Sequence, residues 1–121
     1  MDFSASYRDA SGATHGHNYV LEVTVSGPVN RETGMVIDLK DLKDLMTREI
    51  EARFDHRSLS DDTPYFRDRA ATPENFAALI FSLLDHALPA GSLSRVRLSP
   101  MEFPAEDVEV QGVVVGLMRR F

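Results

Sequence analysis

One face of the segment 19–25 is apolar at every position. The apolar residues of that face are Tyr19, Leu21, Val23 and Val25. A repeat of two residues is typical of a half-buried β-strand, so we expect a strand here. The segment 26–34 contains glycine, proline and asparagine, which favour turns. The short run 35–38 then predicts a brief extended return that completes a hairpin.

Two further segments repeat their apolar residues every three or four positions, as amphipathic helices do. The first is expected to begin after Asp38, whose side chain can cap it, and to end near Arg53. The second is expected to follow Thr72 as cap, with Pro73 at the first helical position, and to end before Pro89. The apolar residues of the first segment are Leu39, Leu42, Leu45, Met46 and Ile50. Those of the second are Phe76, Leu79, Ile80, Leu83, Leu84 and Leu88.

The remaining segments complete the predicted architecture. Residues 54–70 have no period and contain serine, aspartate and proline, so we expect an ordered loop, long enough to suspect a function. The alternation over 94–99 and the apolar run over 107–118 predict two more strands, separated by 100–106. Strands, then helices, then strands favour an α+β domain with both helices on one face of an antiparallel sheet. We expect residues 1–121 to form one such domain.

Composition narrows the function classes. Thirteen lysines and arginines against 19 aspartates and glutamates give a net charge of -6, which argues against a nucleic-acid partner. A few local arginines could still hold a phosphate. The chain has no cysteine, so it forms no disulfide and has no thiolate ligand or nucleophile. No apolar run is long enough to span a membrane and no secretory signal is present, which predicts a cytoplasmic protein.

Two of the four histidines, His15 and His17, lie two residues apart at the start of the predicted strand. Residues i and i+2 share a face of a strand, so both imidazoles are expected on the side of Leu21. Neutral imidazole is a good Zn²⁺ ligand, and Gly16 leaves room for close approach of a ligand. The alternative is two ordinary polar residues at a strand entrance, and two ligands alone do not make a metal site.

Asp55 and His56, in the predicted loop, are a second candidate. A carboxylate can orient an imidazole that transfers protons near neutral pH, although neighbours in sequence need not bond to each other. A solvated surface pair is the alternative. Thr72 and Glu74 are explained equally well as helix-capping residues, and His86 as a residue that compensates the dipole of the second helix.

Six segments of residues 3–98, in this order, resemble the 6-pyruvoyltetrahydropterin synthase and 6-carboxytetrahydropterin synthase family: FSASY, HGHNYVLEVTV, TGMVIDLKDLK, FDHRSL, PYF and TPENFA. The resemblance implies the tunnelling fold, a four-stranded antiparallel sheet with two helices on one face. Subunits of this fold join edge to edge into a β-barrel, as a homo-trimer or homo-hexamer. It also implies a zinc-dependent lyase that acts on a small-molecule pterin, 7,8-dihydroneopterin triphosphate, in a pocket between subunits.

In that family three histidines bind zinc, and the resemblance assigns two of these positions to His15 and His17. The third position holds Tyr7, whose phenol must first lose a proton of reference pKa about 10. The family's catalytic cysteine is replaced by Ser11, whose hydroxyl is much harder to deprotonate than a thiol. The expected metal set is therefore His15, His17 and Tyr7, with Ser11 at the nucleophile position.

The resemblance also gives roles to residues of the second half of the chain. Asp55 and His56 match the pair that completes the proton relay, and Thr72 and Glu74 match a segment that lines the pterin pocket. The family's pterin anchor is a glutamate, and the nearest carboxylate here is Glu102, because the aligned position is a proline.

Two hypotheses follow. The chain is a pterin-processing lyase with a degenerate active site, or it is a non-catalytic pterin-binding paralogue that serves as partner subunit of an active synthase. A lyase with altered chemistry on the same substrate is a variant of the first.

Overall fold

The computed structural model describes residues 1–101, 106–111 and 114–119. They form one six-stranded sheet with the strand order β3-β1-β2-β4-β5-β6. The strands are β1 (Asp2–Arg8), β2 (Thr14–Val25), β3 (Arg57–Ser58), β4 (Leu93–Pro100), β5 (Glu106–Gln111) and β6 (Val114–Arg119). Neighbouring strands pair antiparallel, except that β3 runs parallel to β1. The predicted α+β class is confirmed, whereas the count of four strands is wrong.

Four local differences separate the four predicted strands from the six observed. Strand β1 was not predicted, and β3 lies within the segment 54–70 that was predicted to be a loop. The other two differences are a predicted strand that is absent and one that is divided into two. The segment 35–38 forms no strand, because hydrogen bonds within the preceding turn, from Asn30 N to Met35 O and from Gly34 N to Asn30 O, fold the chain back on itself. The apolar run 107–118 is not one strand, because its two halves pair with each other, with Val110 opposite Val115.

Both predicted helices are present. The first runs from Leu39 to Phe54 as α1 (Leu39–Met46), the π-helical turn η1 (Thr47–Glu51) and α2 (Ala52–Phe54). The second is α3 (Pro73–Ala87). The predicted caps are confirmed: Asp38 accepts a hydrogen bond from Lys40 N at 2.8 Å, and Thr72 accepts one from Asn75 N at 3.2 Å. None of the helices described is long and apolar enough to cross a bilayer.

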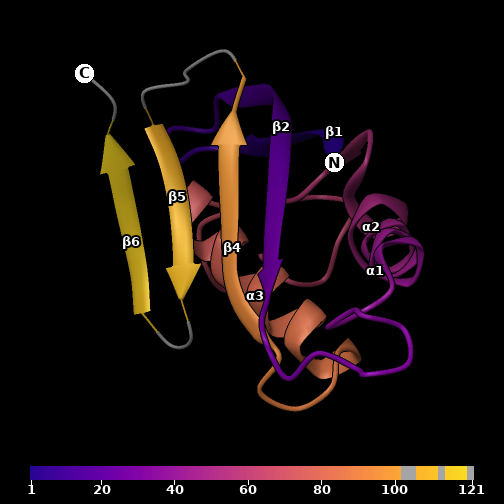
Figure 1. Ribbon diagram of the computed structural model, residues 1–121. Helices are drawn as coiled ribbons and strands as arrows, with labels where there is room; N and C mark the ends of the chain where they lie inside the picture. The colour runs from indigo at the N-terminus through magenta and orange to yellow at the C-terminus, as the bar shows by residue number, and fades with distance from the viewer. Residues whose placement is uncertain (102–105, 112–113, 120–121) are drawn as a thin grey trace.

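The helices cover one face of the sheet, with α3 behind β4 and the α1–α2 segment beyond β2 (Figure 1). The core beneath them is built around Phe76, which is fully buried. The ring of Phe76 meets four aromatic rings edge to face at centroid distances of 5.1 to 6.2 Å: those of Phe3, Tyr19, Phe54 and Phe66. This cluster fixes strands β1 and β2 against α3 and thereby positions the residues that follow along the same strands.

Candidate functional site

The register of β1 and β2 brings three predicted ligands together on the face that carries the core. Tyr7 pairs with His15, and the neighbouring pair on this face is Ala5 with His17. The Tyr7 ring stacks on the His15 ring at a centroid distance of 5.3 Å and lies 5.9 Å from the His17 ring. The prediction that both histidines share the face of Leu21 is confirmed.

The loop between these strands adds a residue that the sequence did not indicate. His15 donates a hydrogen bond from Nε2 to Oδ2 of Asp9 at 2.7 Å. The other carboxylate oxygen accepts bonds from the Ser11 hydroxyl at 2.6 Å and from the backbone N–H groups of Ser11 and Ala13. The loop closes with Gly12 at φ +87°, a conformation that suits glycine. An aspartate shortly before Ser-Gly is the signature of such a turn, and it could have pointed to Asp9.

Hydrogen bonds from the Ser11 hydroxyl and from His15 hold the pKa of the Asp9 carboxyl well below its usual range. Such a carboxylate is a weak base, so Asp9 does not activate the Ser11 hydroxyl it binds. In this arrangement Ser11 stabilises the turn. The role of Ser11 at the nucleophile position stays a prediction. The hydrogen bond to Asp9 offers a structural explanation of the same residue.

The side chains beside Tyr7 fit a three-imidazole zinc site poorly. Within the described ranges, no three histidine, aspartate or glutamate side chains are arranged to hold a metal ion. A phenol stands opposite His15, where the resemblance places the third imidazole, and Nε2 of His15 is engaged by Asp9. A metal would have to displace that carboxylate or bind it. We therefore assign no step of the chemistry to zinc.

Asp55 and His56 lie on the other side of β1, where the chain enters β3. Ser4 N donates to Asp55 Oδ1 at 2.9 Å, and His56 N donates to Ser4 O at 2.6 Å. The two side chains are not hydrogen bonded to each other, because Oδ2 of Asp55 and Nε2 of His56 are 3.7 Å apart. His56 has φ 58°, the left-handed region, and its side chain is 81% exposed. Backbone bonds to β1 thus hold His56 in an unusual conformation with its imidazole in solvent.

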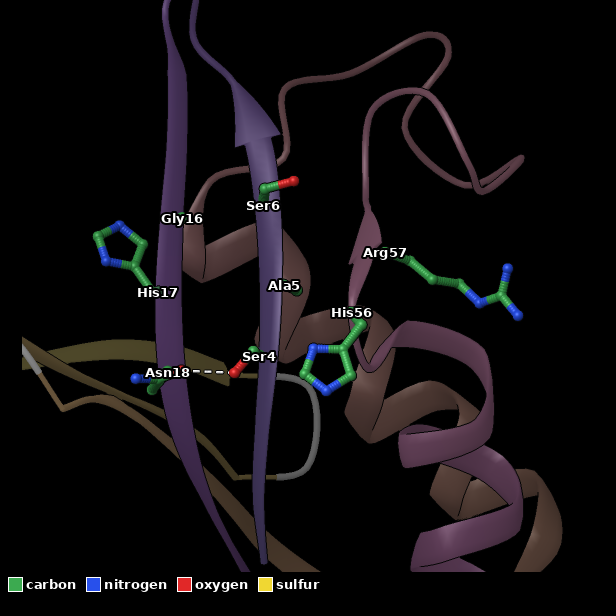
Figure 2. Close-up of a pocket in the computed structure, with 8 residues that line it drawn as sticks. All are labelled: Ser4, Ala5, Ser6, Gly16, His17, Asn18, His56 and Arg57. Carbon is green, nitrogen blue, oxygen red and sulfur yellow. Dashed lines mark hydrogen bonds between the residues drawn. The ribbon is translucent and has the colours of Figure 1, made fainter.

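A cavity of about 460 Å³ is lined by one residue from each group of candidates. Its lining includes His17 from β2 and His56 from the entrance to β3, together with Ser4, Ala5, Ser6, Gly16, Asn18 and Arg57. In Figure 2 the two imidazoles lie on opposite sides of the β1–β2 pair, and the hydrogen bond from Ser4 to Asn18 lies between them. Both residues thus line one cavity, but their imidazoles lie on opposite sides of the strand pair and are not in contact.

The predicted pterin-binding residues are less informative. Thr72 uses its side chain to cap α3, and Glu74 lies half-buried in the first turn of that helix, where a carboxylate favours the dipole. Glu102 lies outside the described residues. The role of all three in ligand binding stays a prediction.

Comparisons with known proteins agree on one family. The sequence model described as 6-pyruvoyl tetrahydropterin synthase matches residues 3–112. Over 84 residues the chain is 46% identical to a 6-pyruvoyl tetrahydrobiopterin synthase of Pongo abelii and 45% identical to that of Homo sapiens. Both matches cover 69% of this chain and 58% of the relative, so the chain spans little more than half the length of these relatives.

Two further relatives extend the comparison. A putative 6-carboxy-5,6,7,8-tetrahydropterin synthase of Archaeoglobus fulgidus is 40% identical over 91 residues, which is 75% of this chain and 71% of the relative. The solved structure of the Caenorhabditis elegans 6-pyruvoyl tetrahydropterin synthase superimposes with a TM-score of 0.80 at 29% identity. It covers 93% of this chain and 91% of that one.

Proposed function

Because the chain belongs to the 6-pyruvoyl tetrahydropterin synthase family, we propose that it is a pterin-processing lyase that acts on 7,8-dihydroneopterin triphosphate. The observation that carries this proposal is the cavity lined by both His17 and His56. Relatives named as 6-pyruvoyl and as 6-carboxy synthases are both similar to the chain, so the product stays open.

In the proposed reaction His56 removes a proton from the substrate side chain. An imidazole can take up and release protons near neutral pH, and this one is exposed to solvent at the cavity. Asp55 is fixed by the backbone N–H of Ser4 and supplies a negative charge beside the imidazole, with Oδ2 3.7 Å from Nε2 of His56. Loss of triphosphate from the adjacent carbon would complete the elimination.

Three further predictions belong to the same proposal. We propose that Thr72 and Glu74 bind the pterin ring and that Glu102 anchors it. We also propose a homo-trimer or homo-hexamer, supported by the open sheet, whose edge strands β3 and β6 would otherwise expose unpaired backbone groups. A cytoplasmic location stays a prediction.

The test is release of triphosphate from 7,8-dihydroneopterin triphosphate by the purified chain. We expect His56→Ala to lower kcat by about 10²-fold or more, the usual contribution of a general base, and Asp55→Asn to lower it less. His86→Ala is the matched control, since His86 is an exposed histidine on α3 that bonds the Ser82 carbonyl. Equal activity of the His56→Ala and His86→Ala variants would exclude the assigned role of His56.

A non-catalytic pterin-binding paralogue, or partner subunit of an active synthase, is the second candidate. The specific observation in its favour is the engagement of His15 and Ser11 by Asp9, with a tyrosine opposite His15. Binding of the pterin without release of triphosphate, measured by fluorescence titration and phosphate analysis on one sample, would select this candidate over the lyase.

A further inference from the structure

A second cavity, of about 420 Å³, lies between the loop that joins β1 to β2 and the segment that precedes α3. From the first it is lined by Arg8, Asp9, Ala10 and Gly12, and from the second by Ser60, Phe66, Arg67, Arg69, Ala70 and Ala71. We call it the arginine pocket. Asp9 lines the pocket and also binds His15 at 2.7 Å, so the pocket adjoins the Tyr7–His15 stack.

The charge of this pocket is opposite to that of the chain. The chain carries -6 overall, whereas the lining has three arginines and one aspartate. Arg8 forms an ion pair with Asp61. Within the part of the chain that the structure describes, Arg67 and Arg69 form no ion pair. Two guanidinium groups are therefore available to a ligand in an otherwise acidic protein.

Local contacts shape the pocket for an anion. The guanidinium of Arg69 lies over the Phe66 ring at 5.8 Å from its centroid, and the buried Phe66 ring in turn packs on Phe76 of the core. Ser60 accepts a bond from Arg8 N at 3.0 Å and keeps its own hydroxyl proton for donation. The carboxylate of Asp9 already accepts bonds from Ser11, Ala13 and His15, and its single negative charge is outnumbered by the guanidinium groups of Arg67 and Arg69.

We propose that the arginine pocket binds a polyphosphate chain. Arginine forks match phosphate oxygens with paired N–H donors, and a cavity of this size holds several phosphate groups but is too polar to favour an apolar ligand. The assignment of this chain to the phosphate tail of the substrate rests on the proposed function. The anion site itself does not, because it stands on Arg67, Arg69 and the pocket alone.

The direct test is calorimetric titration of the full chain with sodium tripolyphosphate at low and at moderate salt. We expect the double variant Arg67→Ala/Arg69→Ala to bind at least about tenfold more weakly, with a smaller dependence on salt, because two charge-assisted contacts are lost. Arg31→Ala/Lys40→Ala is the matched control: both residues are exposed, lie away from the pocket and carry the same total charge. Equal weakening in both double variants would overturn the proposal.

A charge-preserving variant separates loss of the site from loss of the fold. Arg67→Lys/Arg69→Lys keeps both charges but not the forks, and we expect its affinity to lie between those of the wild type and the alanine variant. Unchanged affinity of the alanine variant, with an unchanged unfolding temperature, would contradict the pocket.

Tripolyphosphate binding that depends on the arginines, in a chain that releases no triphosphate from the pterin, would support the pocket and exclude the lyase. Triphosphate release with the same KM in wild type and alanine variant would support the lyase and exclude the assignment of the pocket to the phosphate tail of the substrate.

Discussion

Strands β1 and β2 carry two stacked ring pairs of almost the same geometry, one at each end of the shared ladder. Phe3 and Tyr19 stack at 5.4 Å with 25° between their planes, and Tyr7 and His15 stack at 5.3 Å with 23°. The first pair is 4% and 1% exposed, whereas the side chain of His15 is 43% exposed. The same backbone register thus produces equivalent contacts in two different environments.

The two ring pairs differ in the residues that they contact. The buried pair continues into Phe76, so its rings contribute to the core. The half-buried pair of Tyr7 and His15 continues into Asp9, whose carboxylate binds His15, and into the arginine pocket beyond it. Stability is therefore expected to depend mainly on one end of the strand pair and ligand chemistry on the other, which mutations can test separately.

The largest effect is expected from Phe76→Ala. This side chain is fully buried and meets four aromatic rings, so its removal leaves a cavity that should lower the free energy of unfolding by about 3–5 kcal/mol. Tyr7→Phe, at the half-buried end, keeps the ring and should change the free energy of unfolding by less than about 1 kcal/mol. Urea denaturation of both variants measures the contrast, and similar losses would contradict the separation of the two ends.

Much of this contrast could be predicted from local sequence signals. The alternation that begins at Tyr19 places His15 and His17 on the core face. The caps Asp38 and Thr72 accept hydrogen bonds from residues only two or three positions further along the chain. Each of these features depends on neighbours in the chain, so a period or a capping residue suffices to predict it.

The features that were missed depend on contacts distant in sequence. Strand β3 has two residues, too few for a period, and exists because β1 offers Ser4 and Ser6 as partners. The contact of Asp9 with His15 requires the loop conformation, and the arginine pocket requires residues from two loops separated by about fifty positions. Net charge could indicate that local arginines were possible, but it could not locate them.

The second largest effect is expected from Tyr7→His, which places a third imidazole opposite His15. We expect zinc affinity to rise on the order of a hundredfold, since imidazole binds zinc as a neutral ligand and even outer-shell changes alter metal affinity by 10- to 100-fold. Competition with a chromophoric chelator and metal analysis measure affinity and stoichiometry. Tyr7→Phe, which offers no donor, is the control and should not gain zinc. Equal affinity of the wild type and Tyr7→His would show that the tyrosine does not limit metal binding at this end.

The smallest effect is expected from Asp9→Asn, and it depends on pH. Hydrogen bonds from Ser11 and His15 lower the pKa of Asp9 in the folded chain below its unfolded value of about 4. The ionised carboxylate therefore contributes stability that is fully present above that pH and is lost as the pH falls through the folded pKa. We expect the difference in unfolding free energy between wild type and Asp9→Asn to be constant from about pH 5 to 7 and to shrink below about pH 4.

Urea denaturation across this pH range measures the difference. Asp68→Asn, which removes an exposed loop carboxylate, is the control for the loss of one negative charge. A difference that grows toward low pH would mean that ionised Asp9 destabilises the fold. In that case the stack of Tyr7 on His15 alone would order the half-buried end of the strand pair.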